Sequence, residues 1–243
     1  MGVSGGPDMI QDGLIFVWNG TDQNCWDGSS TTHTDLVRGG LGNKLGANSL
    51  ALSGSHVYFT GGGDRVCTIN YSSSLITVPT GDTGTWMWAQ YFVDSGNWDH
   101  PNFGKEIGSG WNGTGGFVFG TGWGLDGPRW GIGGQYYQVY PGDNSATYKN
   151  AQWQVYCVTY TRNTVDGLKT YLMDSQGIRL ADAQNTSDLA ISSSAADLVI
   201  GATNIRGGNW QGYMDFVYMW NIALDQTTVY DTFNILKNRF GLT

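Results

Sequence analysis

Apolar side chains recur mainly at every second position along this chain, which is the period of β-strands. Residues 153–161 show the pattern most clearly, because Trp153 and Cys157 are expected on one face and Tyr156 and Val158 on the other. Residues 14–18 are fully apolar, as expected for a strand buried on both faces. The other predicted strands are residues 49–52, 56–59, 86–93, 168–174, 198–201 and 213–221. With shorter segments between them, we expect roughly 11 to 13 strands, which is typical of two packed sheets.

Polar turns predict how some of these strands are joined. Ser53, Gly54 and Ser55 separate two strands by a tight turn, and a polar turn at residues 162–167 separates two more. Both arrangements are typical of β-hairpins. Residues 19–47 are rich in Gly, Thr, Asn and Asp and are expected to form a long loop region.

One helix is expected, at residues 226–238. Val229, Phe233 and Leu236 form an apolar stripe at helical spacing. Asp225 precedes the helix as N-cap, and Gly241 is suited to a left-handed stop at its end. We expect the stripe to pack on the sandwich.

Composition supports a β-rich fold. Of the 243 residues, 14% are aromatic, 13% are charged and 38 are Gly. Aromatic side chains fit the pleated surface of a sheet, and Gly supplies the positive φ angles of tight turns. The sequence therefore predicts an all-β, two-sheet antiparallel β-sandwich with one short C-terminal helix. Residues 12–243 are expected to be a single domain, and residues 1–11 a flexible N-terminal arm.

Charge narrows the range of partners. The net charge is −8, and the 12 Lys and Arg residues are scattered along the chain. Nucleic-acid binding relies on clustered basic residues, so no nucleic-acid partner is expected. No apolar run approaches the roughly 20 residues of a membrane helix, so no membrane insertion is expected. The N-terminus lacks the apolar core of a secretion signal, which predicts synthesis in the cytoplasm without secretory export.

Aromatic residues and Gly alternate in short bursts between residues 97 and 143. Two interpretations stay open: cross-strand packing inside the sandwich, or an exposed platform that binds sugar rings or a protein partner. The second interpretation predicts a ligand-binding patch made of Trp98, His100, Trp111, Trp123, Trp130 and Tyr136.

Several motifs occur in the order found in one known family. The longest is GYMDFVYMWNIALDQTTVYDTFNILKNRFGL at residues 212–242, and residues 198–202 (LVIGA) precede it. Residues 13–18 and 49–58 match the opening strand and a following hairpin. The chain resembles laminin-G-like domains of the concanavalin A-like lectin/glucanase superfamily, which implies a jelly-roll sandwich. The ending NILKNRFGL is similar to stand-alone versions in tailed-bacteriophage particles.

Candidate chemistry is sparse. Glu106 is the only Glu, so the E-x-D-x-x-E site of the superfamily's glycosidases is absent, and a retaining mechanism needs two carboxyl groups. No G-x-S-x-G elbow and no closely spaced His pair are present. Where the family hairpin usually carries two Asp residues, this chain has Ser55 and His56. That departure argues against a calcium site, although the sequence leaves a calcium ion open, and no other cofactor or metal is expected.

Other acidic and sulfur-containing residues have simpler explanations. Asp residues in loops are suited to turns, where they need no metal ion; candidates of this kind are Asp64, Asp82, Asp94 and Asp99. Cys157 lies in a strand pattern and is expected in the core. Whether Cys25 and Cys67 form a disulfide is left open by the sequence.

These features predict a non-catalytic structural protein of a tailed-phage virion, which decorates the capsid or belongs to a tail or fibre assembly. Its expected partners are other virion proteins and further copies of itself. The alternative is a carbohydrate-binding, lectin-like adhesion module that contacts host surface glycans. A polysaccharide hydrolase is the remote third hypothesis.

Overall fold

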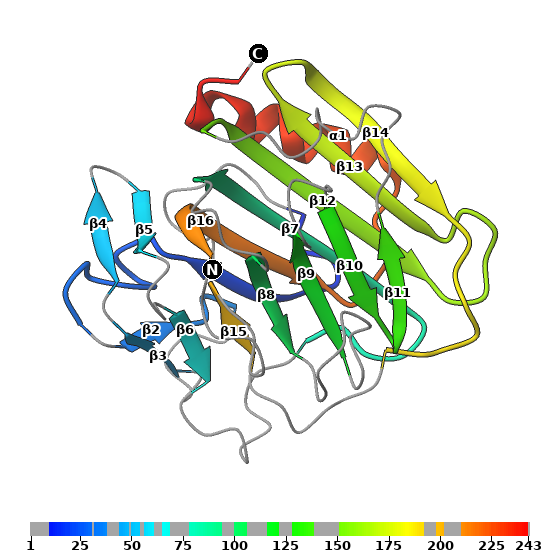
Figure 1. The fold of residues 1–243 in the computed structure, drawn as a ribbon, viewed down its shortest axis with the longest axis horizontal. Helices are drawn as coiled ribbons and strands as arrows, with labels where there is room; N and C mark the ends of the chain where they lie inside the picture. Colours follow the sequence, from blue (N-terminus) through cyan, green and yellow to red (C-terminus); the bar gives the residue numbers. More distant parts are fainter. Residues whose placement is uncertain are drawn as a thin grey trace.

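The computed structural model describes residues 10–30, 32–37, 44–48, 50–53, 56–60, 65–68, 78–93, 100–105, 116–121, 128–138, 151–191, 198–201 and 210–242. These residues form two antiparallel sheets stacked as a sandwich, with one helix near the C-terminus (Figure 1). The predicted fold class is confirmed.

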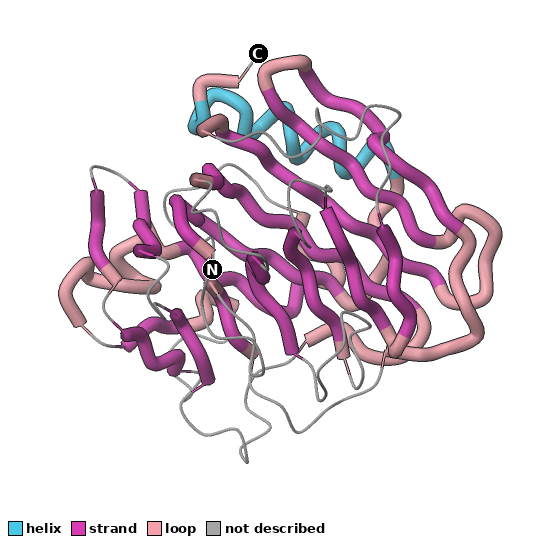
Figure 2. Tube along the Cα trace, viewed as in Figure 1, coloured by secondary structure: helices cyan, strands magenta, loops and turns pink. Residues whose placement is uncertain are grey.

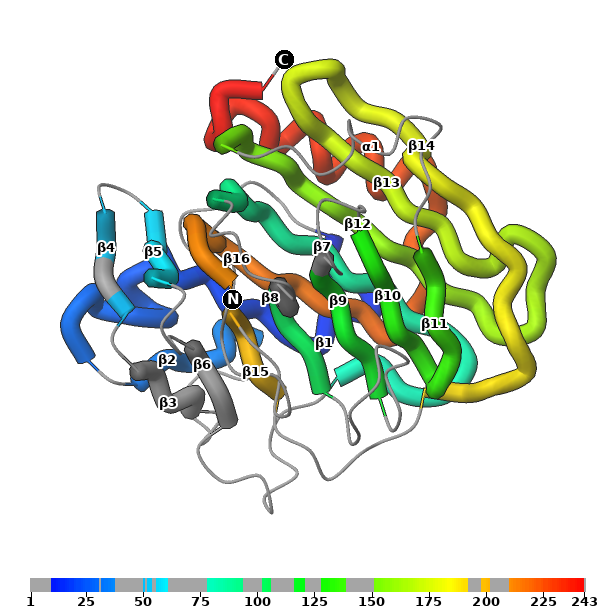
Figure 3. The backbone as a smooth tube through the Cα atoms, viewed as in Figure 1, coloured from blue at the N-terminus to red at the C-terminus, as the bar shows by residue number. Residues whose placement is uncertain are grey.

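The first sheet, sheet A, has the strand order β14-β13-β12-β7-β16-β5-β4, and β1 also pairs with β16. Its strands are β1 (Leu14–Asn19), β4 (Ala51–Ser53), β5 (His56–Thr60), β7 (Thr83–Phe92), β12 (Trp153–Thr161), β13 (Leu168–Asp174), β14 (Gly177–Gln184) and β16 (Gln211–Trp220). Figure 3 shows β1 and β16 side by side although they come from opposite ends of the chain.

The second sheet, sheet B, has the order β11-β10-β9-β8-β15-β6-β3-β2. Its strands are β2 (Thr32–Thr34), β3 (Lys44–Asn48), β6 (Arg65–Thr68), β8 (His100–Lys105), β9 (Phe117–Thr121), β10 (Pro128–Ile132), β11 (Gln135–Gln138) and β15 (Val199–Ile200).

The main core lies between the two sheets. Trp88 of sheet A is fully buried, and its ring centroid lies 5.2 Å from that of Phe103 and 5.3 Å from that of Phe119, both in sheet B. The predicted facing of β12 is confirmed, because Tyr156 packs in this core while Cys157 packs on the opposite face of sheet A.

Helix α1 (Gln226–Leu236) covers part of that opposite, outer face, and Figure 2 shows the helical segment lying along one side of the strands. Asp225 caps the helix, as predicted, by accepting a hydrogen bond from the Thr228 amide at 2.8 Å. The α-helix ends earlier than predicted, at Leu236, and continues as the 3₁₀ turn η1 (Lys237–Phe240). Gly241 then adopts the predicted left-handed conformation, with φ of 63°. Within the described residues, no helix has the length and apolar character needed to cross a membrane.

Some strand predictions were wrong. Sixteen strands occur among the described residues, more than expected. Strand β2 and all but the last residue of β3 lie within residues 19–47, which were predicted to be loop. Strand β14 was not predicted, because it is an edge strand whose residues are all half-buried or exposed. Such a strand has no buried face and therefore lacks the apolar alternation that marks the others.

Candidate functional site

A row of aromatic side chains crosses the outer face of sheet A. Tyr58 on β5 lies opposite Tyr213 on β16, Tyr213 lies opposite Tyr91 on β7, and Tyr91 lies opposite Trp153 on β12. His56 lies two residues before Tyr58 and therefore on the same face of β5. Together these five residues are called the aromatic patch.

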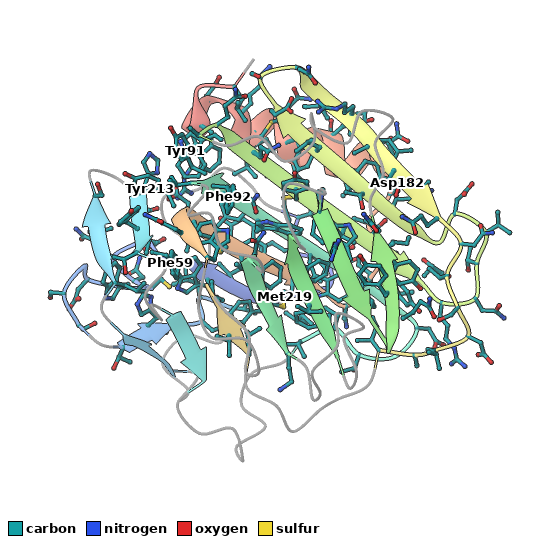
Figure 4. All side chains as sticks on the ribbon, viewed as in Figure 1. Phe59, Tyr91, Phe92, Asp182, Tyr213 and Met219 are labelled. Carbon is teal, nitrogen blue, oxygen red and sulfur yellow. The ribbon has the colours of Figure 1, made fainter. Side chains whose placement is uncertain are left out.

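The strand period explains why these rings reach the surface. In β5, Val57 and Phe59 are fully buried in the core between the sheets, so His56 and Tyr58 point to the opposite side. Phe92 is buried in the same core, and its neighbour Tyr91 faces outward. All five patch residues are half-buried rather than covered. Figure 4 shows Tyr91 and Tyr213 near each other, and they are register partners on the neighbouring strands β7 and β16.

The rings of the patch contact one another. The centroids of Tyr58 and Tyr213 are 4.9 Å apart, and those of Tyr91 and Tyr213 are 5.6 Å apart. The His56 and Trp153 centroids are 4.7 Å apart. Phe240 of η1 packs against Trp153 with a centroid distance of 4.8 Å and closes one side of the patch. The result is a continuous apolar surface whose rings hold each other in place.

A buried carboxylate lies beneath the patch. Asp215 Oδ2 is 2.8 Å from His56 Nδ1, and the Asp215 side chain has no exposed surface. Strand β16 has a bulge between Met214 and Phe216, which leaves Asp215 without a partner in the register with β7. A bulge of this kind re-aims a side chain. Here Asp215 is the extra residue between Met214, which faces the core, and Phe216, which faces outward.

Arg239 approaches the same carboxylate from η1. Its Nη2 atom is 3.5 Å from Asp215 Oδ2 and donates a hydrogen bond to Asn19 at 3.1 Å and another to Thr21. The guanidinium also lies over the Phe240 ring, 5.5 Å from its centroid. Arg239 thus ties the C-terminal turn to β1 and to the carboxylate that supports the patch.

The geometry assigns the proton of His56. A carboxylate only accepts hydrogen bonds, so the imidazole nitrogen facing Asp215, Nδ1, carries the proton. In the neutral ring this leaves Nε2 as a hydrogen-bond acceptor. The His56 side chain is 27% exposed, so a ligand on the patch can approach it. The Gln211 side chain adds a polar group nearby and donates to the Tyr58 hydroxyl at 3.0 Å.

The patch predicted from the sequence is only partly described. Trp98, Trp111 and Trp123 lie outside the described residues, and the side chain of His100, on β8, also lies outside them. Tyr136, on β11, is 36% exposed, and the Arg129 guanidinium lies 5.9 Å from its ring centroid.

Trp130 does not belong to an exposed patch. Its side chain is fully buried between the sheets, and its Nε1 donates to Thr170 Oγ1 at 2.8 Å. The prediction for this residue was wrong because β10 turns the indole inward, where it packs against Trp88. For Trp130, the interpretation as cross-strand packing is the correct one.

The candidate metal ligand Asp82 and the thiol of Cys25 are explained by an ion pair and by burial. The described residues include no group of three or more His, Cys, Asp or Glu side chains that could hold a metal ion. Asp82 pairs with Arg162 at 3.0 Å, whereas Asp64, Asp94 and Asp99 lie outside the described residues. Cys25 is a free, buried thiol, so the structure does not contain the Cys25–Cys67 disulfide that the sequence left open.

Comparisons with known proteins add the fold relationship. No protein-family model matches the sequence, and neither does any curated protein sequence. Domain 4 of AbnA, a GH43 extracellular arabinanase from Geobacillus stearothermophilus solved with arabinotriose, aligns with a TM-score of 0.57 and 11% identity, over 90% of this chain and 97% of that domain. At 11% identity, this likeness shows a shared β-sandwich fold.

Two further structures agree with this assignment. A Trypanosoma rangeli sialidase mutant with trans-sialidase activity has a TM-score of 0.60 and 11% identity over 98% of this chain, but only 35% of the sialidase is covered. The botulinum neurotoxin serotype D ligand-binding domain, solved with N-acetylneuraminic acid, has a TM-score of 0.58 and 12% identity, over 93% of this chain and 51% of that domain. At 11% and 12% identity, these likenesses also show a shared β-sandwich fold.

The sequence contained a signal for the aromatic patch that was overlooked. On the strands that carry it, His56, Tyr58, Tyr91, Trp153 and Tyr213 occupy positions that alternate with core residues. Large aromatic side chains at the outward positions of four separate strands are unusual for a solvated sheet face, where polar residues are expected.

Proposed function

We propose that this protein is a non-catalytic carbohydrate-binding module and that the aromatic patch is its sugar-binding surface. The observation that carries the proposal is the row of four half-buried rings at directly opposed positions on β5, β16, β7 and β12. Aromatic rings offer large apolar faces to the apolar faces of sugar rings, and tyrosine hydroxyls add polar contacts.

The sheet supplies rigidity to this surface. The four rings stand on neighbouring, hydrogen-bonded strands and contact one another, so little side-chain freedom remains to be lost on binding. Polar groups at the edge, His56 and Gln211, are placed to fix the orientation of a ligand. Apolar faces with a few fixed polar groups are typical of small-molecule sites.

The fold relationship supports the same proposal. The arabinanase domain and the toxin domain were solved with arabinotriose and N-acetylneuraminic acid respectively. Those ligands belong to those proteins, and the likeness to this chain is one of fold. It favours the carbohydrate-binding alternative over a purely structural role.

The carboxylates near the patch support a non-catalytic role. Glycoside hydrolysis by the usual retaining or inverting route needs two carboxyl groups that flank the scissile bond. Among the described residues that contact the patch, Asp215 is the carboxylate, and it is fully buried and paired with His56. Glu106 is the only Glu in the chain. Because Asp215 is buried and paired with His56, it is suited to holding that ring in place rather than to transferring a proton to a sugar.

The virion role stays a prediction that rests on the ending at residues 234–242. None of the similar structures named above is a phage protein. The two roles are compatible, since an adhesion module on a particle would present the patch to host surface glycans.

The test begins with a glycan array and then measures affinity by isothermal titration calorimetry for the best ligand. Trp153→Ala and Tyr213→Ala are each expected to weaken binding at least about tenfold, which corresponds to roughly 1.4 kcal/mol, because each removes a ring face. Tyr58→Ala, near the sheet edge, provides a third variant. Circular dichroism and melting temperature show that each variant is folded.

Tyr136→Ala is the matched control, since it removes an exposed aromatic ring from sheet B instead of sheet A. Unchanged affinity in this variant and reduced affinity in the patch variants support the proposal. The opposite pattern would place the ligand on sheet B and overturn the assignment of the patch. An array without any bound glycan would overturn the proposed function.

A further inference from the structure

The charged groups beside the aromatic patch indicate which class of sugar it accepts. Two nitrogen-bearing side chains lie there among the described residues, His56 and Arg239, and both are directed to the carboxylate of Asp215. Arg239 Nη2 also donates to Asn19 and Thr21, and its guanidinium lies over the Phe240 ring at the side of the patch. Its Nη2 atom is therefore engaged by the protein's own acceptors.

An anionic sugar would meet unfavourable electrostatics here. Sugar carboxylates are usually recognised by charge-assisted hydrogen bonds from Arg or Lys. Beneath this patch lies the buried carboxylate of Asp215, and the whole chain carries a net charge of −8. Removing a ligand carboxylate from water without a cation to pair it is costly.

His56 adds a direct chemical selection. With Nδ1 donating to Asp215 at 2.8 Å, the neutral imidazole has a lone pair on Nε2 as its remaining polar group. A sugar hydroxyl can donate to that lone pair. A sugar carboxylate has no proton to donate, so its oxygen and Nε2 would repel each other.

We infer that the patch takes uncharged glycans, with the His56–Asp215 pair presenting Nε2 as an acceptor for a sugar hydroxyl and disfavouring sugar carboxylates. This inference rests on the proposed sugar-binding function. In it Asp215 is a positioning residue, because it contacts His56 and acts through that ring. Other titratable groups near His56, among the described residues, are Arg239 and the phenol of Tyr213.

The experiment compares a neutral oligosaccharide with its sialylated counterpart by calorimetry under identical buffer conditions. The wild-type protein is expected to bind the neutral ligand at least about tenfold more tightly, or roughly 1.4 kcal/mol. In His56→Gln the amide can donate as well as accept, so the preference is expected to shrink.

Asp215→Asn is the second variant. It removes the buried charge and allows the amide to donate to Nδ1, which moves the imidazole proton to Nε2. The sialylated ligand is then expected to gain affinity relative to the neutral one. His56→Gln, at a partly exposed position, keeps the test informative if Asp215→Asn does not fold.

The outcomes separate this inference from the proposed function. Equal or tighter binding of the sialylated ligand by wild type, still lost in Trp153→Ala, would overturn the inference and leave the proposed function standing. An unchanged preference in both His56→Gln and Asp215→Asn would also overturn it. Binding of either ligand that is unaffected by Trp153→Ala would overturn the proposed function itself.

Discussion

Acid should weaken the fold through one buried histidine, His33 on β2. Its side chain has no exposed surface, and its ring stacks on Trp26 with centroids 4.7 Å apart. The indole Nε1 of Trp18 donates to His33 Nδ1 at 3.0 Å. A second proton would have to sit on Nδ1, directly facing that N–H donor, inside the core.

The size of the effect follows from the pKa. Burial lowers the pKa of His33 from 6.5 to about 4, although the nearby charge of Asp27 acts in the opposite direction. Each pKa unit corresponds to about 1.4 kcal/mol, so the shift corresponds to about 3 kcal/mol. Between the two pKa values the unfolded chain binds a proton that the folded protein does not. Stability is therefore full above about pH 6.5 and is lost as the pH falls towards about 4.

The assay is urea unfolding of wild type and His33→Asn from about pH 7.5 to about pH 4. Asn keeps an acceptor for the Trp18 indole but does not titrate in this range. His33→Asn is expected to be less stable near neutral pH, because the ring stacked on Trp26 is lost. The gap between the two proteins should shrink by about 3 kcal/mol as the pH falls. Parallel stability curves would refute the reasoning, since every other ionisable group is the same in both proteins.

Three further predictions concern the rest of the sandwich. Gly212→Ala should lower the free energy of unfolding by at least about 2 kcal/mol, because Gly212 has φ of 141° and a Cβ there would clash with the Tyr91 carbonyl of β7. A melting temperature within error of wild type would contradict this prediction. Phe233→Ala should lower the free energy of unfolding by about 3–5 kcal/mol in the same urea assay, because it removes the buried contact between α1 and sheet A. Ile235→Ala, at a 39% exposed position, is the control and should have little effect. Burial raises the pKa of Cys25 to about 12 and that of Cys157 well above its usual range, so a thiol reagent at about pH 8 should label neither thiol until the protein unfolds. Rapid labelling of the native protein, detected by peptide mapping, would contradict their burial.

Local patterns were enough to predict much of the fold. The two faces of β12 followed from strict alternation, since Trp153 and Cys157 lie on one side of sheet A and Tyr156 on the other. The helix was marked by Asp225 at its start and Gly241 at its end, because capping depends on neighbouring backbone groups. Strand β14 escaped prediction because a half-exposed edge strand has no apolar face.

The aromatic patch depends on information that local patterns do not contain. Tyr58, Tyr91, Trp153 and Tyr213 come from four strands spread over most of the chain, and only the register between those strands places them in one row. The bulge that turns Asp215 toward His56 is likewise a property of the pairing between β16 and β7. Sequence reasoning instead selected the region with the highest density of aromatic residues, where Trp130 proved to be buried.

An NMR titration of isotopically labelled protein with its best glycan tests the central claim most directly. The indole signal of Trp153, assigned with Trp153→Phe, and the ring signals of Tyr58, Tyr91 and Tyr213 are expected to shift together with a single affinity. Tyr136 on sheet B serves as the internal reference and should not move. Shifts confined to Tyr136 and its neighbours, with the four patch rings unchanged, would contradict the account.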